Sequence, residues 1–426
     1  MDATLSAILE RVEGNREEIV RDVVSCVRIP SVVGHEGAAQ DFMRGIYERL
    51  NLDVDAFEAD LDVVSRHPDY VRAGLETVGR PNVVGTLRGT DPAARSLALN
   101  GHVDVVSPEP LGAWTHDPWG GELVGVGKEQ RIYGRGALDM KSGTIACAHA
   151  LKAILDTGMR PRGTVVVQSV VEEEAGGGAG TLATLLRGHT ADALLSAEPF
   201  YRTIVLGQPG VMLFRVTVHG KTAHAAHSQM GVNAIGKMIP LYEAMVALDA
   251  ERAARWQDPF FGGSTGRAVN LSIGVMRAGD WPSTVAGRAA MECRIAFIPP
   301  QTREDVRREV EERIAEVARA DGWLRAHPPT IEWFGWQADP WRQDATSPFV
   351  TTLSTAVATV AGSAPPLEAS TGGLDARFAG PFSIPAACIG ARGGGMHGAD
   401  EYVEMESVIE TVKIIAATIV SWCGVS

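Results

Sequence analysis

Residues 96–106 read SLALNGHVDVV, an almost continuous apolar run that ends in the polar side chains His102 and Asp104. Such a run is typical of a strand buried on both faces of a parallel sheet, with polar residues at its carboxyl end. Two later segments repeat the pattern, GTVVVQSVVEEEAGGG at 163–178 and DALLSAEP at 192–199. Ligand sites of open α/β sheets gather where parallel strands end, so we expect these three ends to share one crevice.

Helical segments alternate with these strands. We expect one helix at the N-terminus, a second near residues 36–50 and a third over 141–157, after the sequence DMKSG. Alternation of buried strands with helices predicts an α/β fold, with a central and mostly parallel sheet flanked by helices.

The pattern changes near residue 209. Three segments have the alternation of antiparallel strands (211–220, 267–279 and 287–297), and PPTIEWFGW at 328–336 is expected to close the unit. Helices are expected over 231–250 and 303–320. The second begins with a capping-box pattern at Thr302 and Asp305 and carries one apolar stripe, formed by Val306, Val310, Ile314 and Val317.

These patterns predict an α+β domain with an antiparallel sheet, inserted into the α/β domain. The expected boundaries are 1–208 for the first part of the catalytic domain, 209–338 for the insertion and 339–426 for the second catalytic part. The length of 426 residues fits two domains, because single hydrophobic cores usually stop growing below that size. A domain inserted into another gives a natural cleft between the two.

The composition excludes several classes of protein. The formal net charge of −13, from 39 Lys+Arg against 52 Asp+Glu, disfavours nucleic acid and anionic membranes as partners. An apolar fraction of 45%, with 21% charged residues, is that of a globular chain. Five scattered cysteines without CxxC spacing argue against a disulfide framework and against a thiolate metal site.

Neither end of the chain has the pattern of a membrane segment. The N-terminal residues carry acids early and have a helical period, where a signal peptide would have a basic start and an apolar block. The last apolar stretch is interrupted by Glu410 and Lys413 and is too short to cross a bilayer. We therefore expect a cytoplasmic protein.

Residues with metal-binding side chains recur in glycine-rich or strand-like segments. Hydrolysis of an amide near neutral pH needs a stronger nucleophile than bulk water, and two divalent cations provide one by acidifying a water molecule. Imidazole and carboxylate ligands without thiolates suit zinc, with cobalt and manganese as alternatives. The pattern therefore predicts a two-metal hydrolase with candidates His102, Asp104, Asp139, Glu173, Glu174, Glu198 and His397.

Six segments, in their order along the chain, carry a resemblance to a known family. They are GHVDVV, WTHDPWGG with RIYGRGALDMKSG, EEEAGGGAG, SAEP, KTAHAAHS with GVNAI, and GGLDAR with MHGADE. The chain resembles the co-catalytic zinc family that includes acetylornithine deacetylase, succinyl-diaminopimelate desuccinylase, aminoacylase and carboxypeptidase G. The resemblance covers almost the whole chain.

The resemblance implies a role for each metal candidate. His102 and Glu198 would hold one metal, Glu174 and His397 the other, and Asp139 would bridge the two. Asp104 would be the partner of the His102 ring, because side chains two residues apart on a strand face the same side. Glu173, the middle of three glutamates that begin with Glu172, would be the general base.

The resemblance also implies roles for the insertion, as a lid and dimerisation domain of a homodimer. His224 would reach a catalytic cleft, in dimeric relatives that of the other subunit, and stabilise the oxyanion. Arg294 matches a family arginine that grips a substrate carboxylate, and Arg377 near Asp375 is a second candidate.

One segment departs from the family pattern. Many relatives have Asn-Val-x-Pro ahead of the strand with the arginine, but this chain reads GDWPSTVAG at 279–287, with Ser283 and Ala286 at the nearest positions. The resemblance therefore does not define the substrate pocket. Trp281 could form an apolar wall there, which would suit a bulky or aromatic acyl or amine group.

The leading hypothesis is a metal-dependent amidohydrolase that removes the acyl group from an N-acyl amino acid or a similar small amine. A dipeptidase, tripeptidase or carboxypeptidase with the same two metals is the alternative, because the bond broken is chemically the same. Carbamoyl-amide hydrolysis is disfavoured, since the glutamates of that branch precede a signature other than AGGGAG. A metal-free binding or regulatory protein would be expected to lack a ligand or the base, and this chain has all of them.

Overall fold

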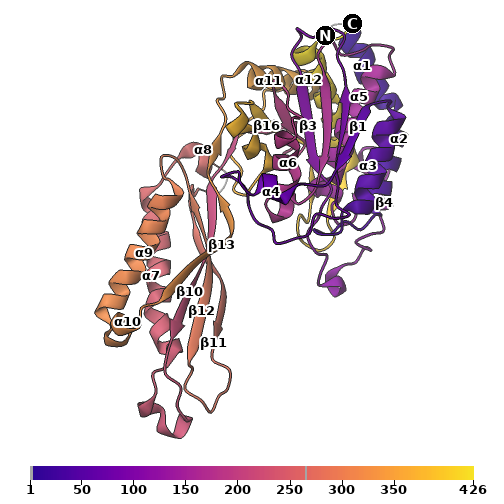
Figure 1. Cartoon of the computed structure of the whole chain (residues 1–426). Coiled ribbons are helices and arrows are strands. Elements are labelled where there is room, and N and C mark those ends of the chain that lie inside the picture. Colours follow the sequence, from indigo (N-terminus) through magenta and orange to yellow (C-terminus); the bar gives the residue numbers. More distant parts are fainter. Residues whose placement is uncertain (1–2, 264–265) are drawn as a thin grey trace. The chain divides into compact units, whose positions relative to one another are not determined.

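The computed structural model describes residues 3–263 and 266–426, which form two compact units (Figure 1). The first unit contains the chain up to Leu206, Arg342–Glu368 and Leu374–Ser426. The second contains Gly207–Trp341 and Ala369–Gly373. The domain boundaries expected after residues 208 and 338 stay a prediction.

An eight-stranded sheet forms the centre of the first unit, in the order β1-β2-β6-β3-β7-β16-β8-β15. Its four middle strands, β6, β3, β7 and β16, run parallel. On one flank β2 pairs antiparallel with β6 and with β1, and on the other flank β8 pairs antiparallel with β16. This confirms the predicted α/β class with a mostly parallel sheet. The strands are β1 (Asp53–Phe57), β2 (Asn82–Leu87), β3 (Leu97–His102), β6 (Val165–Val170), β7 (Leu194–Ser196), β8 (Ile204–Val205), β15 (Leu367–Glu368) and β16 (Ala386–Cys388).

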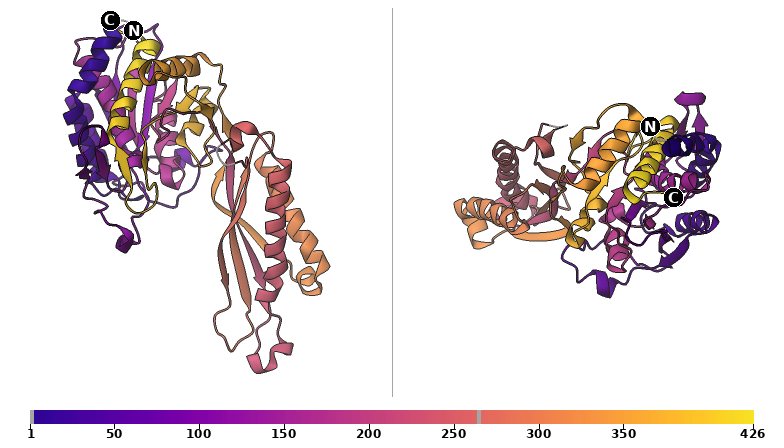
Figure 2. Two further views of the ribbon diagram at one scale, coloured as in Figure 1. Left: turned by 180° about the vertical axis from the view of Figure 1, so that it is seen from behind. Right: turned by 90° about the horizontal axis from the view of Figure 1, so that it is seen from above.

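The apolar runs form buried strands because helices and turns cover both faces of this sheet. Every residue of β3, β6 and β7 is buried. On one face Gln40 of α3 exchanges hydrogen bonds with Ser169, and on the other Asn100 donates to Thr181 of η5. Figure 2 shows the helices around the sheet from two further sides.

The helices of the first unit include the three expected from sequence. The N-terminal helix is interrupted at Asn15, because Gly14 and Asn15 are poor helix formers, and α2 begins at the next residue. The helices are α1 (Ala3–Gly14), α2 (Arg16–Val27), α3 (Gly37–Arg49), α4 (Leu61–Val64), α5 (Ser142–Leu155), α6 (Ala183–Leu186), α11 (Pro348–Ala361) and α12 (Met405–Cys423). Short helical turns are η1 (Leu111–Ala113), η2 (Gly127–Glu129), η3 (Ala137–Lys141), η4 (Glu173–Ala175), η5 (Gly178–Leu182) and η7 (Asp375–Phe382).

A second, smaller sheet in this unit has the order β17-β18-β5-β4 and was not expected from sequence. Its strands are β4 (Glu122–Val124), β5 (Arg131–Tyr133), β17 (Gly393–Gly394) and β18 (Tyr402–Glu404). Tyr402 of β18 lies opposite Tyr133 of β5. The pairing thus joins the segment before η3 to the segment around His397.

The second unit is an antiparallel sheet, β11-β12-β10-β13, covered by helices. Helix α9 spans Arg303–Ala320 with Thr302 and Asp305 in a capping box, and both features confirm the prediction. Val306, Val310 and Ile314 lie in the unit's core, and Val317 packs against it. The elements are β9 (Gly207–Gln208), β10 (Gly210–His219), η6 (Ala225–Met230), α7 (Ala234–Arg255), α8 (Pro259–Gly262), β11 (Leu271–Ala278), β12 (Arg288–Phe297), α9, α10 (Gly322–Ala326) and β13 (Thr330–Ala338). The short strand β14 (Trp341–Arg342) has one residue in each unit.

Two expectations from the sequence concern membrane crossing and the state of the cysteines. Within 3–263 and 266–426, no helix combines the length and the apolar character that crossing a membrane requires. The five cysteines are free and buried.

Candidate metal centre

The candidate ligands converge because the strands that carry them are neighbours. Strands β6, β3 and β7 lie side by side and parallel, so their carboxyl ends meet at one edge of the sheet. His102 ends β3, the glutamate turn follows β6, and Glu198 follows β7. Asp139 reaches the same place from η3, and His397 from the segment after β17.

Three side chains form the first potential metal site. His102, Asp139 and Glu198 each offer a ligand atom, and these atoms lie within 4.8 Å of one another. The Nε2 atom of His102 lies 3.3 Å from Oδ1 of Asp139. Nε2 of His102 and Oε1 of Glu198 are buried without a hydrogen-bond partner among the described residues. Since buried polar atoms are normally paired, these two orphaned atoms suit a bound cation.

The second potential site shares Asp139 with the first. Its members are Asp139, Glu174 and His397, with ligand atoms again within 4.8 Å. Nε2 of His397 lies 3.0 Å from Oε1 of Glu174 and 3.3 Å from Oδ2 of Asp139. The two carboxylate oxygens of Asp139 therefore face two different histidines, as a carboxylate shared by two cations would.

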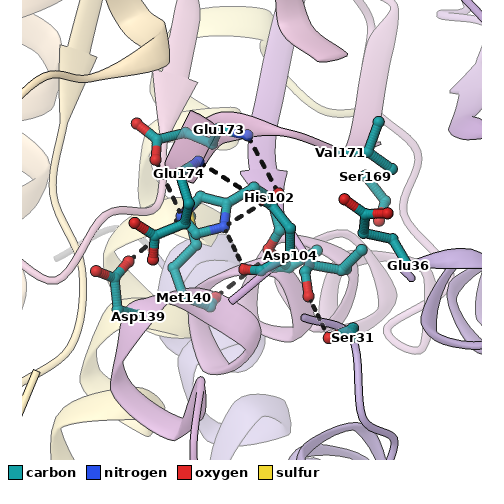
Figure 3. A network of polar contacts seen from close by, with 12 residues as sticks. Ser31, Glu36, His102, Asp104, Asp139, Met140, Ser169, Val171, Glu173 and Glu174 are labelled. Atoms are coloured by element: carbon teal, nitrogen blue, oxygen red, sulfur yellow. Dashed lines mark hydrogen bonds and ion pairs between the residues drawn. The ribbon is translucent and has the colours of Figure 1, made fainter. Parts of the chain in front are cut away.

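Asp104 organises both the histidine and the glutamates around it. Its buried carboxylate lies 3.6 Å from Nδ1 of His102, and its backbone oxygen lies 2.9 Å from the same nitrogen. The two carboxylate oxygens accept the backbone N–H groups of Glu173 and Glu174, at 3.2 and 3.0 Å (Figure 3). Asp104 therefore fixes the start of the glutamate turn as well as the imidazole.

The electrostatics of the cluster also suit bound cations. Burial raises the pKa of Glu173 well above its ordinary value, and the nearby Glu198, Asp375 and Glu174 raise it further. Burial would lower the pKa of His102, but the carboxylates around it raise that pKa well above the usual range. Divalent cations would offset this crowding of negative charge, and imidazole with carboxylate donors is a set that such cations take.

Glu173 differs from its neighbour Glu174 in that it belongs to neither ligand group. Its Oε2 atom lies 3.9 Å from Nε2 of His102, so the carboxylate is next to the first group. Figure 3 shows the two adjacent glutamates with separate carboxylates. A carboxylate beside the ligands, and not among them, can exchange protons.

A buried network behind the turn was missed by the sequence reasoning. Arg80 pairs with Glu36 at 2.6 and 2.8 Å and reaches Glu172 at 3.3 Å. Glu172 has φ of 70°, in the left-handed region, and its carboxylate accepts the N–H of Ala179 at 3.2 Å. The contacts of Arg80 join segments remote in sequence, and no local pattern signals them.

Glu401 was also missed, although it ends the quoted motif MHGADE. Its buried carboxylate accepts the backbone N–H of Asp139 at 3.0 Å. An acid at the end of a motif that already supplies a ligand was the one signal that could have found it.

The remaining predicted residues do not all lie in the unit that holds the ligands. His224 and Arg294 belong to the second unit. His224 is exposed, and its Nδ1 accepts the N–H of Ala226 at 3.1 Å. Arg294 donates to Oδ1 of Asn270 at 2.7 Å and to the carbonyl of Thr371 at 3.3 Å.

Arg377 and Trp281 have contrasting surroundings. Arg377, in the first unit, is buried and donates to the carbonyls of Gly176 at 2.8 Å and Asp69 at 3.5 Å. Its guanidinium therefore supports the turn that carries the glutamates. Trp281, in the second unit, is 65% exposed.

Comparisons with known proteins agree with this geometry. Residues 98–421 match Peptidase family M20/M25/M40. An N-formyl-4-amino-5-aminomethyl-2-methylpyrimidine deformylase of Halalkalibacterium halodurans is 30% identical over 347 residues, 78% of this chain and 75% of the relative. A succinyl-diaminopimelate desuccinylase of Methylorubrum extorquens is 28% identical over 394 residues, 88% of this chain and 91% of the relative.

A solved structure shares the fold. It is a dinuclear metal binding peptidase of the M20 family from Bacillus subtilis, with a TM-score of 0.62 at 15% identity, covering 96% of this chain and 99% of the other. The family match, the relatives and the two ligand groups together identify a metal-dependent amidohydrolase. The chain belongs to peptidase family M20/M25/M40.

Proposed function

We propose that this protein removes the acyl group from a small N-acyl amine or N-acyl amino acid, with two divalent cations bound on either side of Asp139. The observation that carries the proposal is that the two carboxylate oxygens of Asp139 face His102 and His397, 3.3 Å away in each case. His102 and Glu198 would complete one site, and Glu174 and His397 the other. Zinc is the metal we favour, because the donors are imidazole and carboxylate.

The substrate class is supported by the relatives. The deformylase and the desuccinylase are both named for the removal of an acyl group from nitrogen. Hydrolysis of a dipeptide is the alternative, since a peptide bond is also an amide.

In the mechanism we propose, Glu173 moves the proton. Bound cations would supply Lewis acidity, which lowers the pKa of water and polarises the amide carbonyl. Glu173 takes a proton from the attacking water as the water oxygen bonds to the carbonyl carbon. It then returns a proton to the amide nitrogen as the carbon–nitrogen bond breaks. The products are a carboxylic acid and an amine. Asp104 keeps the base in position by accepting its backbone N–H.

His224 is our candidate for the oxyanion donor. Because its Nδ1 accepts the N–H of Ala226, the hydrogen of the neutral ring is on Nε2, which is then a donor. A donor directed at the developing oxyanion contributes strongly to catalysis. Arg294 and Arg377 remain our candidates for binding a substrate carboxylate. Arg377 would do so in addition to supporting the glutamate turn.

We also propose that residues 209–338 form a lid and dimerisation domain of a homodimer located in the cytoplasm. Helix α7 exposes Ile235, Ile239, Tyr242 and Val246, which the helical period places on one face. β11, an edge strand of the sheet, exposes Met276. An exposed apolar stripe of this kind suits a contact with a second copy. Light scattering should show a dimer for the wild type and a monomer for Ile239→Glu.

The substrate class is tested by a panel of N-formyl, N-acetyl and N-succinyl amines alongside dipeptides, with added zinc, cobalt or manganese. We expect kcat/KM for at least one N-acyl amine to exceed that for every dipeptide. Hydrolysis of dipeptides without any turnover of N-acyl amines would overturn the proposed substrate class and favour the peptidase alternative.

A further inference from the structure

The Glu401 carboxylate is the centre of a hydrogen-bond cluster directly behind Asp139. It is completely buried and accepts three backbone N–H groups from the segment that carries Asp139. Its Oε1 accepts the N–H groups of Leu138 at 2.9 Å and Asp139 at 3.0 Å, and its Oε2 accepts that of Gly136 at 3.1 Å. One carboxylate thus fixes the backbone from which the candidate bridging ligand projects.

Arg135 connects this cluster to the segment that carries His397. Its side chain is 2% exposed, and Nη1 donates to Oε2 of Glu401 at 2.5 Å. Nη2 donates to the carbonyl of Gly398 at 2.9 Å, one residue after His397. The planar guanidinium therefore holds Glu401 and the His397 segment at the same time, which an ammonium group could not do with the same geometry.

The two histidines are held very differently. His102 is 1% exposed at the end of a central strand, whereas the side chain of His397 is 49% exposed. His397 also has φ of 58°, in the left-handed region, so its backbone depends on the contacts around it. The position of His397 therefore depends on the contacts of Arg135 and Glu401. The position of His102 depends on them less, because its strand is fixed within the sheet.

We infer that the buried Arg135–Glu401 ion pair is a positioning unit that holds Asp139 against the His397 segment and so sets the affinity for the second cation. This inference rests on the proposed roles of Asp139 and His397 as metal ligands. Arg135 and Glu401 are positioning residues, since they contact the backbone around the ligands. Residues that orient ligands typically change metal affinity by roughly 10–100-fold when they are replaced.

The test is a calorimetric titration of the metal-free full-length protein with Zn²⁺, repeated with Co²⁺, whose absorption spectrum reports the coordination of each site. For Arg135→Lys, which keeps the charge but not the fork, we expect the first cation to bind as in the wild type. The second should bind roughly 10–100-fold more weakly. Excess metal should then restore kcat, because no group that touches the substrate has changed. Glu401→Gln, which also loosens the backbone of the shared ligand Asp139, should weaken the second cation more than the first.

Arg252→Lys is the matched control. Arg252 is also a buried arginine that donates to a glutamate, Glu309, and to a backbone carbonyl, that of Ala296 at 2.9 Å, but it lies in the second unit. Its replacement should leave both binding steps unchanged.

Two outcomes would overturn the inference: Arg135→Lys and Glu401→Gln bind both cations as the wild type does, or they lose both to the same extent. A wild-type protein that binds fewer than two cations would instead remove the proposed two-metal centre, and the inference with it. The wild-type titration thus separates failure of the function from failure of the positioning role.

Discussion

Glu173 and Glu174 are adjacent in sequence, and their backbone N–H groups are both bound by Asp104, yet only Glu174 belongs to a ligand group. We expect Glu173→Gln to keep two metals and to lower kcat by roughly two to four orders of magnitude, because it removes only the proton carrier. Glu174→Gln should lose the second metal. Metal content by mass spectrometry and kcat on the same preparations check both. Turnover retained by Glu173→Gln would refute its role as the base.

His224 gives a second prediction about a single residue. If its Nε2–H stabilises the oxyanion, His224→Ala should lower kcat by roughly 10²–10³-fold, because that interaction forms mainly in the transition state. KM and metal content should change little. His227→Ala, at a nearby histidine of the same turn, is the control and should keep wild-type kcat. Equal losses in the two variants would argue for a general effect on the turn.

The sequence predicted ligand candidates more readily than their supports. His102, Asp139 and Glu198 stand in glycine-rich or strand-ending motifs, which mark a place where side chains leave the core together. Glu36, Arg80 and Glu401 are joined to the site only by buried contacts across many residues of sequence. The Arg80–Glu36 pair has no local pattern, so it could not be found before the fold was known, whereas the place of Glu401 at the end of MHGADE was the one signal available for it.

At the scale of the element, periodicity with a capping box located α9, whereas α7 begins at Ala234 and ends at Arg255, later at both ends than the expected 231–250. Helix α9 was located correctly because its cap and its apolar stripe agree. The strands of the second sheet, β4, β5, β17 and β18, were missed because each has only two or three residues, too few for a period. Their pairing is decided by tertiary contacts.

The α9 cap also gives a stability prediction. Thr302 accepts the N–H of Asp305 at 3.1 Å, and Asp305 accepts the N–H of Thr302 at 3.1 Å. Thr302→Ala should therefore lower the free energy of unfolding of the second unit by about 1 kcal/mol. Thr351→Ala, at an exposed position inside α11, should change stability little, since alanine is the better helix former there. Urea unfolding followed by circular dichroism measures both, and equal effects would contradict the role of the cap.

For the whole molecule, bound cations and folding are coupled through the crowded carboxylates. Burial raises the pKa of Glu198 above its ordinary value, so this carboxyl group holds its proton to higher pH in the metal-free folded protein than in the unfolded chain. The protonated Glu198 carboxyl group therefore contributes to the stability of the metal-free protein below its unfolded pKa of about 4.3. This contribution is lost as the pH rises toward the folded pKa. Metal binding needs deprotonated ligands and strengthens over the same range.

We therefore expect chelation to lower Tm, and to lower it more at pH 8 than at pH 6. Differential scanning fluorimetry with and without chelator, at both values of pH, measures the difference. The Arg252→Lys variant, whose substitution lies in the second unit and not in the unit of the ligands, should show the same pH dependence as the wild type. A chelation effect that is equal at both values, or smaller at pH 8, would contradict the coupling.

The central claim is that Asp139 is shared by two cations. Anomalous diffraction from crystals of the zinc-loaded protein, measured at the zinc edge, tests it most directly. We predict two peaks about 3.5 to 4 Å apart, one bound by His102, Glu198 and Asp139 and the other by Glu174, His397 and Asp139. A single peak, or two peaks of which neither contacts Asp139, would contradict the account.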